Sequence, residues 1–110
     1  MLALSVRQPH AELMMLGVKT VEYRSQPTLI RGRRVYIYAS LYCGPAIAAS
    51  GLATGADLQS LPRGKIIGTI EIYGCSFNGE DYEWHLRAPR RLKRPRRPAR
   101  RANPVWFRPW

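Results

Sequence analysis

LSVRQPHA (residues 4–11) and GVKTVEYR (residues 17–24) are the two stretches that decide the fold of this chain. The first joins an apolar run, residues 2–6, to Pro9, which lacks a backbone donor but suits the first turn of a helix. The second alternates polar and apolar side chains, which is the period of a half-buried strand. Together they predict a strand, a short helix and a second strand.

The predicted helix covers residues 10–18, because its apolar residues recur at three- and four-residue spacing and Gly17 offers a left-handed C-terminal cap. In the strand that follows, Thr20, Glu22 and Arg24 share one face. This charged face must look at solvent or into a cleft.

The rest of the chain is rich in strand signals. Residues 35–40 and 82–86 read as strands, and residues 65–75 form the longest one, with bends expected at Gly68 and Gly74. A second short helix is expected over residues 44–50. We therefore predict an α+β, mainly β fold: a small, partly closed β-barrel with two short helices at its mouth.

Basic charge gathers at the C-terminal end. Residues 1–84 hold eight basic and seven acidic residues, whereas residues 85–110 hold ten basic residues and no acidic one. Such asymmetry points to a polyanionic partner, with nucleic acid first and acidic lipid second; a basic tail that serves only solubility is the alternative.

Three regions follow from this pattern within a single domain. Residues 1–87 are the predicted barrel body. Residues 88–102 are a basic, Arg/Pro-rich extended segment, for which repeated prolines favour a polyproline-like path up to residue 98. Residues 103–110 carry three large rings that are costly to leave in water, so we expect this segment to return to the barrel.

The sequence also argues against several classes of protein. Its longest uncharged stretches are broken by Gly and Pro, so neither a membrane span nor a secretion signal is expected. Cys43 and Cys75 lack the spacing of a zinc site, and no phosphate loop or dinucleotide motif occurs. We predict a cytoplasmic monomer without metal or cofactor.

The motifs of this chain resemble the ASCH domain family of the PUA-like superfamily. The two N-terminal stretches give the pattern S-x-R-Q-P, a short helix, then G-x-K-x-x-E-x-R, and the resemblance continues to Pro104-Val105-Trp106-Phe107. It implies a PUA-like barrel with a cleft beside its first helix. The fold is associated with RNA binding, RNA modification and, in some members, hydrolysis.

The first hypothesis is an RNA-binding domain that takes a nucleotide or short single strand in this cleft. The residues expected to line it are Ser5, Arg7, Gln8, Lys19, Glu22, Arg24 and Ser40, with Trp84 as a ring that stacks on a base. Flanking phosphates would be held by the basic segment through Arg90, Arg91, Lys93, Arg94, Arg96 and Arg97.

The alternative is a metal-independent RNA-processing hydrolase centred on Lys19 and Glu22. Members similar in fold are N4-acetylcytidine amidohydrolases with catalytic Lys, Thr and Glu, and another is reported as a ribonuclease. Lys19 matches the family lysine, but Glu22 stands where the family threonine would be. A third hypothesis is a protein-interaction module whose basic segment contacts an acidic partner.

Overall fold

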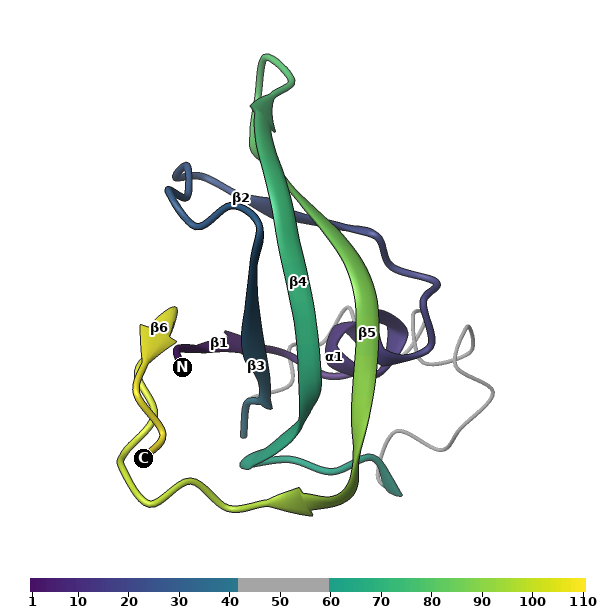
Figure 1. The fold of residues 1–110 in the computed structure, drawn as a ribbon, viewed down its shortest axis with the longest axis vertical. Coiled ribbons are helices and arrows are strands. Elements are labelled where there is room, and N and C mark those ends of the chain that lie inside the picture. Colours follow the sequence, from purple (N-terminus) through teal and green to yellow (C-terminus); the bar gives the residue numbers. More distant parts are fainter. Residues whose placement is uncertain (42–59) are drawn as a thin grey trace.

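The computed structural model describes residues 1–41 and 60–110. Its framework is one six-stranded sheet in the order β2-β5-β4-β3-β1-β6 (Figure 1). The elements along the chain are β1 (Ala3–Val6), α1 (His10–Met15), β2 (Val21–Arg24), β3 (Arg33–Ala39), β4 (Lys65–Phe77), β5 (Tyr82–Arg96) and β6 (Trp106–Phe107). β1 and β3 are parallel, and the other neighbouring strands are antiparallel.

Long strands β4 and β5 form a hairpin that runs the length of the molecule (Figure 1). The pairing of these strands shifts register next to Gly68 and Gly74, which confirms the bends expected there. A third shift lies near Ala88, whose φ of 53° is positive. These irregularities curve the sheet into a partly closed barrel.

Helix α1 covers one side of the sheet with an apolar face. Ala11, Met14 and Met15 are buried and pack against the main core, together with Leu4, Val6, Ile37, Ile67, Ile70, Ile72, Trp84 and Leu86. Burying each large apolar side chain stabilises the fold by roughly 1.5–3 kcal/mol. Gly17, with φ of 76°, turns the chain after α1, so the helix is shorter than the residues 10–18 expected.

The basic segment differs from the expected polyproline-like path. Strand β5 continues through residues 88–96, and Thr69 and Gly68 of β4 pair with Arg90 and Arg91. Backbone pairing with β4 outweighs the preference of the prolines, because a register shift beside Pro89 leaves that residue outside the ladder. The barrel body therefore extends beyond residue 87.

After β5 the chain crosses to the far edge of the sheet, where β6 pairs with β1 (Figure 1). Trp106 stacks on Trp84 with ring centroids 5.7 Å apart, and Phe107 packs edge-on against Tyr38. The C-terminal strand β6 thus forms the edge of the sheet next to β1, the first strand of the chain.

A mainly β, partly closed barrel of PUA-like type is the observed fold, which confirms the predicted fold class. One of the two expected helices is α1; the other, over residues 44–50, lies outside the described residues. Within residues 1–41 and 60–110, no helix has the length and apolar content to cross a membrane.

Candidate functional site

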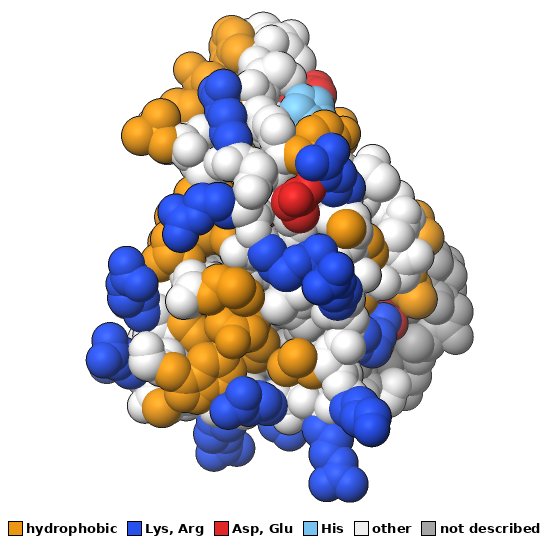
Figure 2. Space-filling model, in the orientation of Figure 1, with side chains coloured by type: hydrophobic (Ala, Val, Ile, Leu, Met, Phe, Trp, Pro, Cys, Tyr) orange, Lys and Arg blue, Asp and Glu red, His pale blue; other side chains and the backbone are white. Residues whose placement is uncertain are grey.

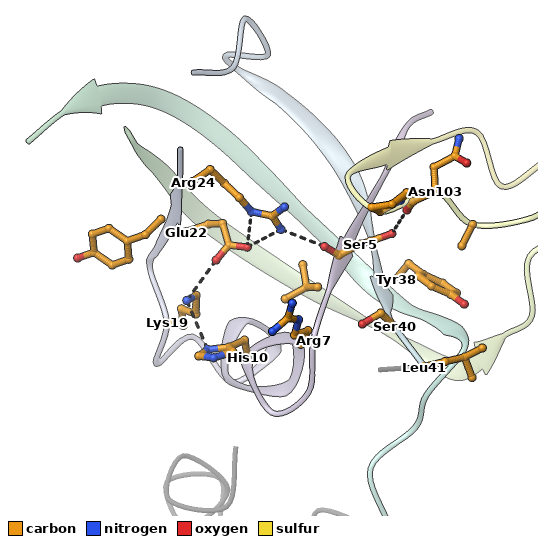
Figure 3. A pocket seen from close by; sticks show the side chains of 14 residues that line it. Ser5, Arg7, His10, Lys19, Glu22, Arg24, Tyr38, Ser40, Leu41 and Asn103 are labelled. Atoms are coloured by element: carbon orange, nitrogen blue, oxygen red, sulfur yellow. Dashed lines mark hydrogen bonds and ion pairs between the residues drawn. The ribbon is translucent and has the colours of Figure 1, made fainter. Parts of the chain in front are cut away.

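An open cleft of about 800 Å³ lies beside α1, between β2 and the segment that leads into β6. Figure 3 shows its two walls: His10, Lys19, Glu22 and Arg24 on one side, and Tyr38 and Asn103 on the other. The cleft lies where the resemblance implies one.

Four side chains on the first wall form a connected ladder (Figure 3). Lys19 Nζ lies 3.5 Å from His10 Nδ1 and 3.2 Å from Glu22 Oε1. The Arg24 guanidinium donates to Glu22 Oε2 from Nε (3.0 Å) and from Nη2 (2.7 Å), and Nη2 also donates to the carbonyl oxygen of Ser5 (3.0 Å). Strand β2 is thereby tied to the end of β1.

The alternation of β2 places this ladder. Glu22 is buried and Tyr23, the next residue, is 54% exposed, so the charged face of the strand looks into the cleft, whereas Tyr23 borders the cleft but is largely open to solvent. A buried carboxylate is costly unless it is paired, and here two cations compensate it. Glu22 therefore acts as the fixed acceptor that orients Lys19 and Arg24.

Burial of the imidazole, followed by the nearby Lys19 ammonium, lowers the pKa of His10 below its usual 6.5. Glu22 acts in the opposite direction but more weakly than either. The ring is therefore neutral near pH 7. With Arg7, Lys19 and Arg24 positive and Glu22 negative, the described lining carries three positive charges and one negative charge, a net of +2.

Ser5, Arg7 and Ser40, three of the predicted binding residues, also line the cleft. Figure 3 shows Arg7 and Ser40 between the ladder and the opposite wall. Ser5 Oγ donates to the carbonyl oxygen of Asn103 at 2.5 Å. This hydrogen bond joins β1 to the C-terminal segment that forms the opposite wall of the cleft. The structure thus brings together Ser5, Arg7, Lys19, Glu22, Arg24 and Ser40.

Gln8 and Trp84 do not line the cleft. Gln8 is fully buried: Nε2 donates to Pro62 O (3.0 Å) and Oε1 accepts from the Glu12 amide (3.0 Å). Trp84 is 2% exposed, and its Nε1 donates to Gln26 O (3.0 Å). Neither side chain therefore lies where it was expected, in the wall of the cleft, because packing satisfies the polar atoms of both and leaves no open face.

The six basic residues predicted to contact phosphate are solvent-exposed and lie on β5 or just after it. Arg91 forms a bidentate ion pair with Glu12, with Nη1–Oε1 and Nη2–Oε2 distances of 2.7 and 2.8 Å. The guanidinium carbon of Arg96 lies 4.3 Å from the ring centroid of Trp110. Arg97 instead lines a second hollow.

Eight lining residues were not among those predicted to bind: Val6, His10, Tyr23, Tyr38, Leu41, Ala102, Asn103 and Pro104. His10 stands directly after the Arg7-Gln8-Pro9 motif, which was the available signal. No local sequence signal marks Asn103, because its contact is with Ser5, 98 positions away in the chain.

The fold and the cleft define a PUA-like barrel with a cationic site beside its first helix. The chain belongs to the ASCH domain family, whose model matches residues 4–103. This membership supports a domain of RNA binding or RNA processing in the general sense.

A solved structure shows the same fold. The chain is similar to a mutant of the ZmASCH protein from Zymomonas mobilis, with a TM-score of 0.59 and 17% identity over 87% of this chain and 72% of that chain. No curated protein matches the sequence.

Proposed function

We propose that this domain binds single-stranded RNA and takes one nucleotide in the cleft. The observation that carries the proposal is the ladder: a buried carboxylate, Glu22, holds Lys19 and Arg24 in place within a lining of net charge +2. Preorganised cationic donors suit a phosphate or the edge of a base, because little side-chain entropy is lost on binding. Arg7 and Ser40 add a guanidinium fork and a hydroxyl to the same space.

Arg7→Gln tests this proposal, because Arg7 is exposed and lines the cleft but is not one of the four residues of the ladder. Loss of one charge-assisted hydrogen bond of about 1.5–3 kcal/mol predicts at least a tenfold weaker affinity for a labelled single-stranded RNA. Arg31→Gln, an equal charge change at an exposed residue beyond the cleft, is the matched control. Equal affinities for wild type and Arg7→Gln would refute the proposal.

A metal-independent hydrolase is the second candidate, favoured by one observation. Lys19 Nζ sits between His10 Nδ1 and Glu22 Oε1, and the neutral His10 ring is able to accept a proton at pH 7. An ammonium at this place would stabilise negative charge that develops on a phosphate or an amide oxygen.

Hydrolysis is tested by incubating RNA, and separately N4-acetylcytidine, with the protein in EDTA. Cleavage by the wild type that is lost in His10→Asn and in Lys19→Gln would establish the enzyme. Intact RNA and intact nucleoside, in a preparation that binds RNA, would leave binding alone as the function of the cleft.

A further inference from the structure

A second hollow of about 550 Å³ adjoins the cleft. The two share three wall residues, Tyr38, Leu41 and Ala102. The second hollow is further lined by Arg63, Gly64, Arg97, Pro98, Ala99, Arg100 and Arg101, and we call it the arginine groove. A ligand that fills the cleft can therefore continue into this groove along a common wall.

The charge of the groove has a single sign. Four arginines line it, and none of its described lining residues is acidic. Arg97, Arg100 and Arg101 are exposed, and in the described part of the chain none of them forms an ion pair with a carboxylate. Arginine side chains with this arrangement match phosphate oxygens, which accept two parallel hydrogen bonds from one guanidinium.

The backbone of the groove is held in place from both sides. The amides of Ala99 and Arg100 both donate to the carbonyl oxygen of Pro109, at 2.9 and 3.0 Å. On the opposite side, the Gly64 amide donates to Ala39 O at 2.6 Å. The exposed arginine side chains thus extend from a fixed backbone, so no backbone entropy has to be lost there when a ligand binds.

A glycine at position 64 is needed for this shape. Its φ of 70° is positive, and a Cβ there would lie 2.8 Å from Leu41 Cδ2. The side chain of Leu41 belongs to the wall that the cleft and the groove share.

We propose that the arginine groove binds the phosphodiester backbone of an RNA strand whose neighbouring nucleotide occupies the cleft. This inference rests on the proposed function and adds the class of ligand: a polynucleotide, because a mononucleotide held in the cleft has no neighbouring phosphodiester to reach the groove. In the groove, the phosphate contacts come from Arg97, Arg100, Arg101 and Arg63.

The test compares two double variants of equal charge. Arg97→Gln/Arg100→Gln removes two groove arginines. Arg31→Gln/Arg33→Gln removes two exposed arginines, one just before β3 and one at its first residue; Arg33 is six residues, or about 20 Å along the strand, from Ala39. Binding of a labelled single-stranded RNA octamer and of the four nucleoside monophosphates is measured by anisotropy and by competition, over a range of salt concentrations.

The groove variant should bind the octamer at least about tenfold more weakly, with a salt slope smaller by about 1.4 because two phosphate contacts are lost. The nucleoside monophosphates should bind the groove variant as they bind wild type. The control variant should change octamer binding much less. Urea unfolding midpoints within error of wild type would show that both variants are folded.

Other outcomes separate the two proposals. If Arg7→Gln weakens octamer binding and the groove variant does not, the groove inference is wrong and the cleft stands. If the groove variant weakens binding and Arg7→Gln has no effect, the cleft as the nucleotide site is wrong. Equal losses in groove and control variants, or equal competition by poly-glutamate, would show a nonspecific polyanion surface and overturn the groove inference.

Discussion

The cleft and the arginine groove share a wall, but two basic side chains of the cleft are paired with a carboxylate, whereas the arginines of residues 97–101 in the groove form no such pair in the described part of the chain. In the cleft, Glu22 is 7% exposed and its two oxygens are paired with Lys19 and Arg24. In the groove, exposed arginines project from an anchored loop, and no carboxylate is among its described lining residues. Lys and Arg side chains surround much of the face shown in Figure 2, with few acidic side chains between them.

This difference separates orientation from attraction. Charges that are paired and partly desolvated fix the geometry of a site, and they cost stability when one partner is lost. Exposed charges are screened by salt and contribute mainly to affinity and to the rate of encounter with a polyanion. Changes in the ladder should therefore appear as loss of stability, and changes in the groove as loss of binding and of salt dependence.

The largest effect on stability is expected from Glu22→Gln. The change leaves Lys19 and Arg24 without their carboxylate, and because both cations keep some access to solvent we expect a loss of about 2 kcal/mol. Urea unfolding measures it. The matched control is Glu71→Gln, whose partner Arg87 is 58% exposed and whose loss should cost under about 1 kcal/mol. Equal costs would contradict the view that the ladder is an orienting device.

Trp110→Ala tests whether the backbone of the arginine groove depends on the packing of the C-terminal residues. Trp110 packs edge-on against Tyr36 at 5.2 Å and lies under the Arg96 guanidinium, next to the Pro109 carbonyl that anchors the groove loop. Loss of this half-exposed ring should cost about 1–2 kcal/mol. RNA octamer affinity should fall a few-fold, while nucleoside monophosphate binding stays constant. An unchanged octamer affinity would mean that the frame of the groove does not depend on this anchor.

Arg91 belongs with the paired charges although it lies in the basic segment. Arg91→Gln breaks the bidentate pair between β5 and α1 and should destabilise the fold by up to about 1 kcal/mol, since Arg91 is 43% exposed. Arg94→Gln, an exposed neighbour with the same charge change, should leave the unfolding midpoint unchanged. A larger midpoint shift in Arg94→Gln than in Arg91→Gln would reverse this assignment.

The smallest effect is a pH dependence that His10 introduces. Because the pKa of His10 in the folded protein is below its usual 6.5, the unfolded chain binds more protons between these two values. Stability should therefore be flat above about pH 7 and fall as the pH drops through 6.5. Unfolding of wild type and His10→Asn across this range measures the effect, and the variant should lose the His10 part of the slope.

The same protonation should act on binding with the opposite sign. A positive His10 adds charge to the cleft, so affinity for an RNA phosphate should rise as the pH falls from 7.5 to 5.5. If wild type and His10→Asn show the same affinity profile, His10 does not face the bound ligand.

Local pattern was enough to predict several elements of the fold and the site. The strand, helix and strand at the N-terminus follow from the turn at Pro9 and Gly17 and from side-chain periodicity. The alternation of residues 20–24 placed Glu22 and Arg24 on one charged face, which looks into the cleft. Gly68 and Gly74 indicated where the sheet bends.

Other predictions depended on which segments meet, and here local pattern was insufficient. The helical N-terminus looked suited to present Gln8 to a ligand, but Pro62, 54 residues away, accepts its amide proton. Trp84 was predicted to stack on a base, but Trp106 of β6 stacks on the face of its ring. Residues 88–96 have the composition of an extended, polyproline-like segment, yet Arg90, Arg91 and Arg96 pair with β4.

By itself, therefore, the sequence determined the strand periods, the bends, the charge asymmetry and the family. Only the tertiary structure decided which charges are paired, because Glu12 meets Arg91 across 79 residues and Ser5 meets Asn103 across 98. Periodicity is set by the local backbone, whereas pairing requires closure of long loops, whose partners no local pattern specifies. The difference between the cleft, whose carboxylate is paired with two cations, and the groove, whose described lining residues include no carboxylate, therefore arises from these long-range contacts.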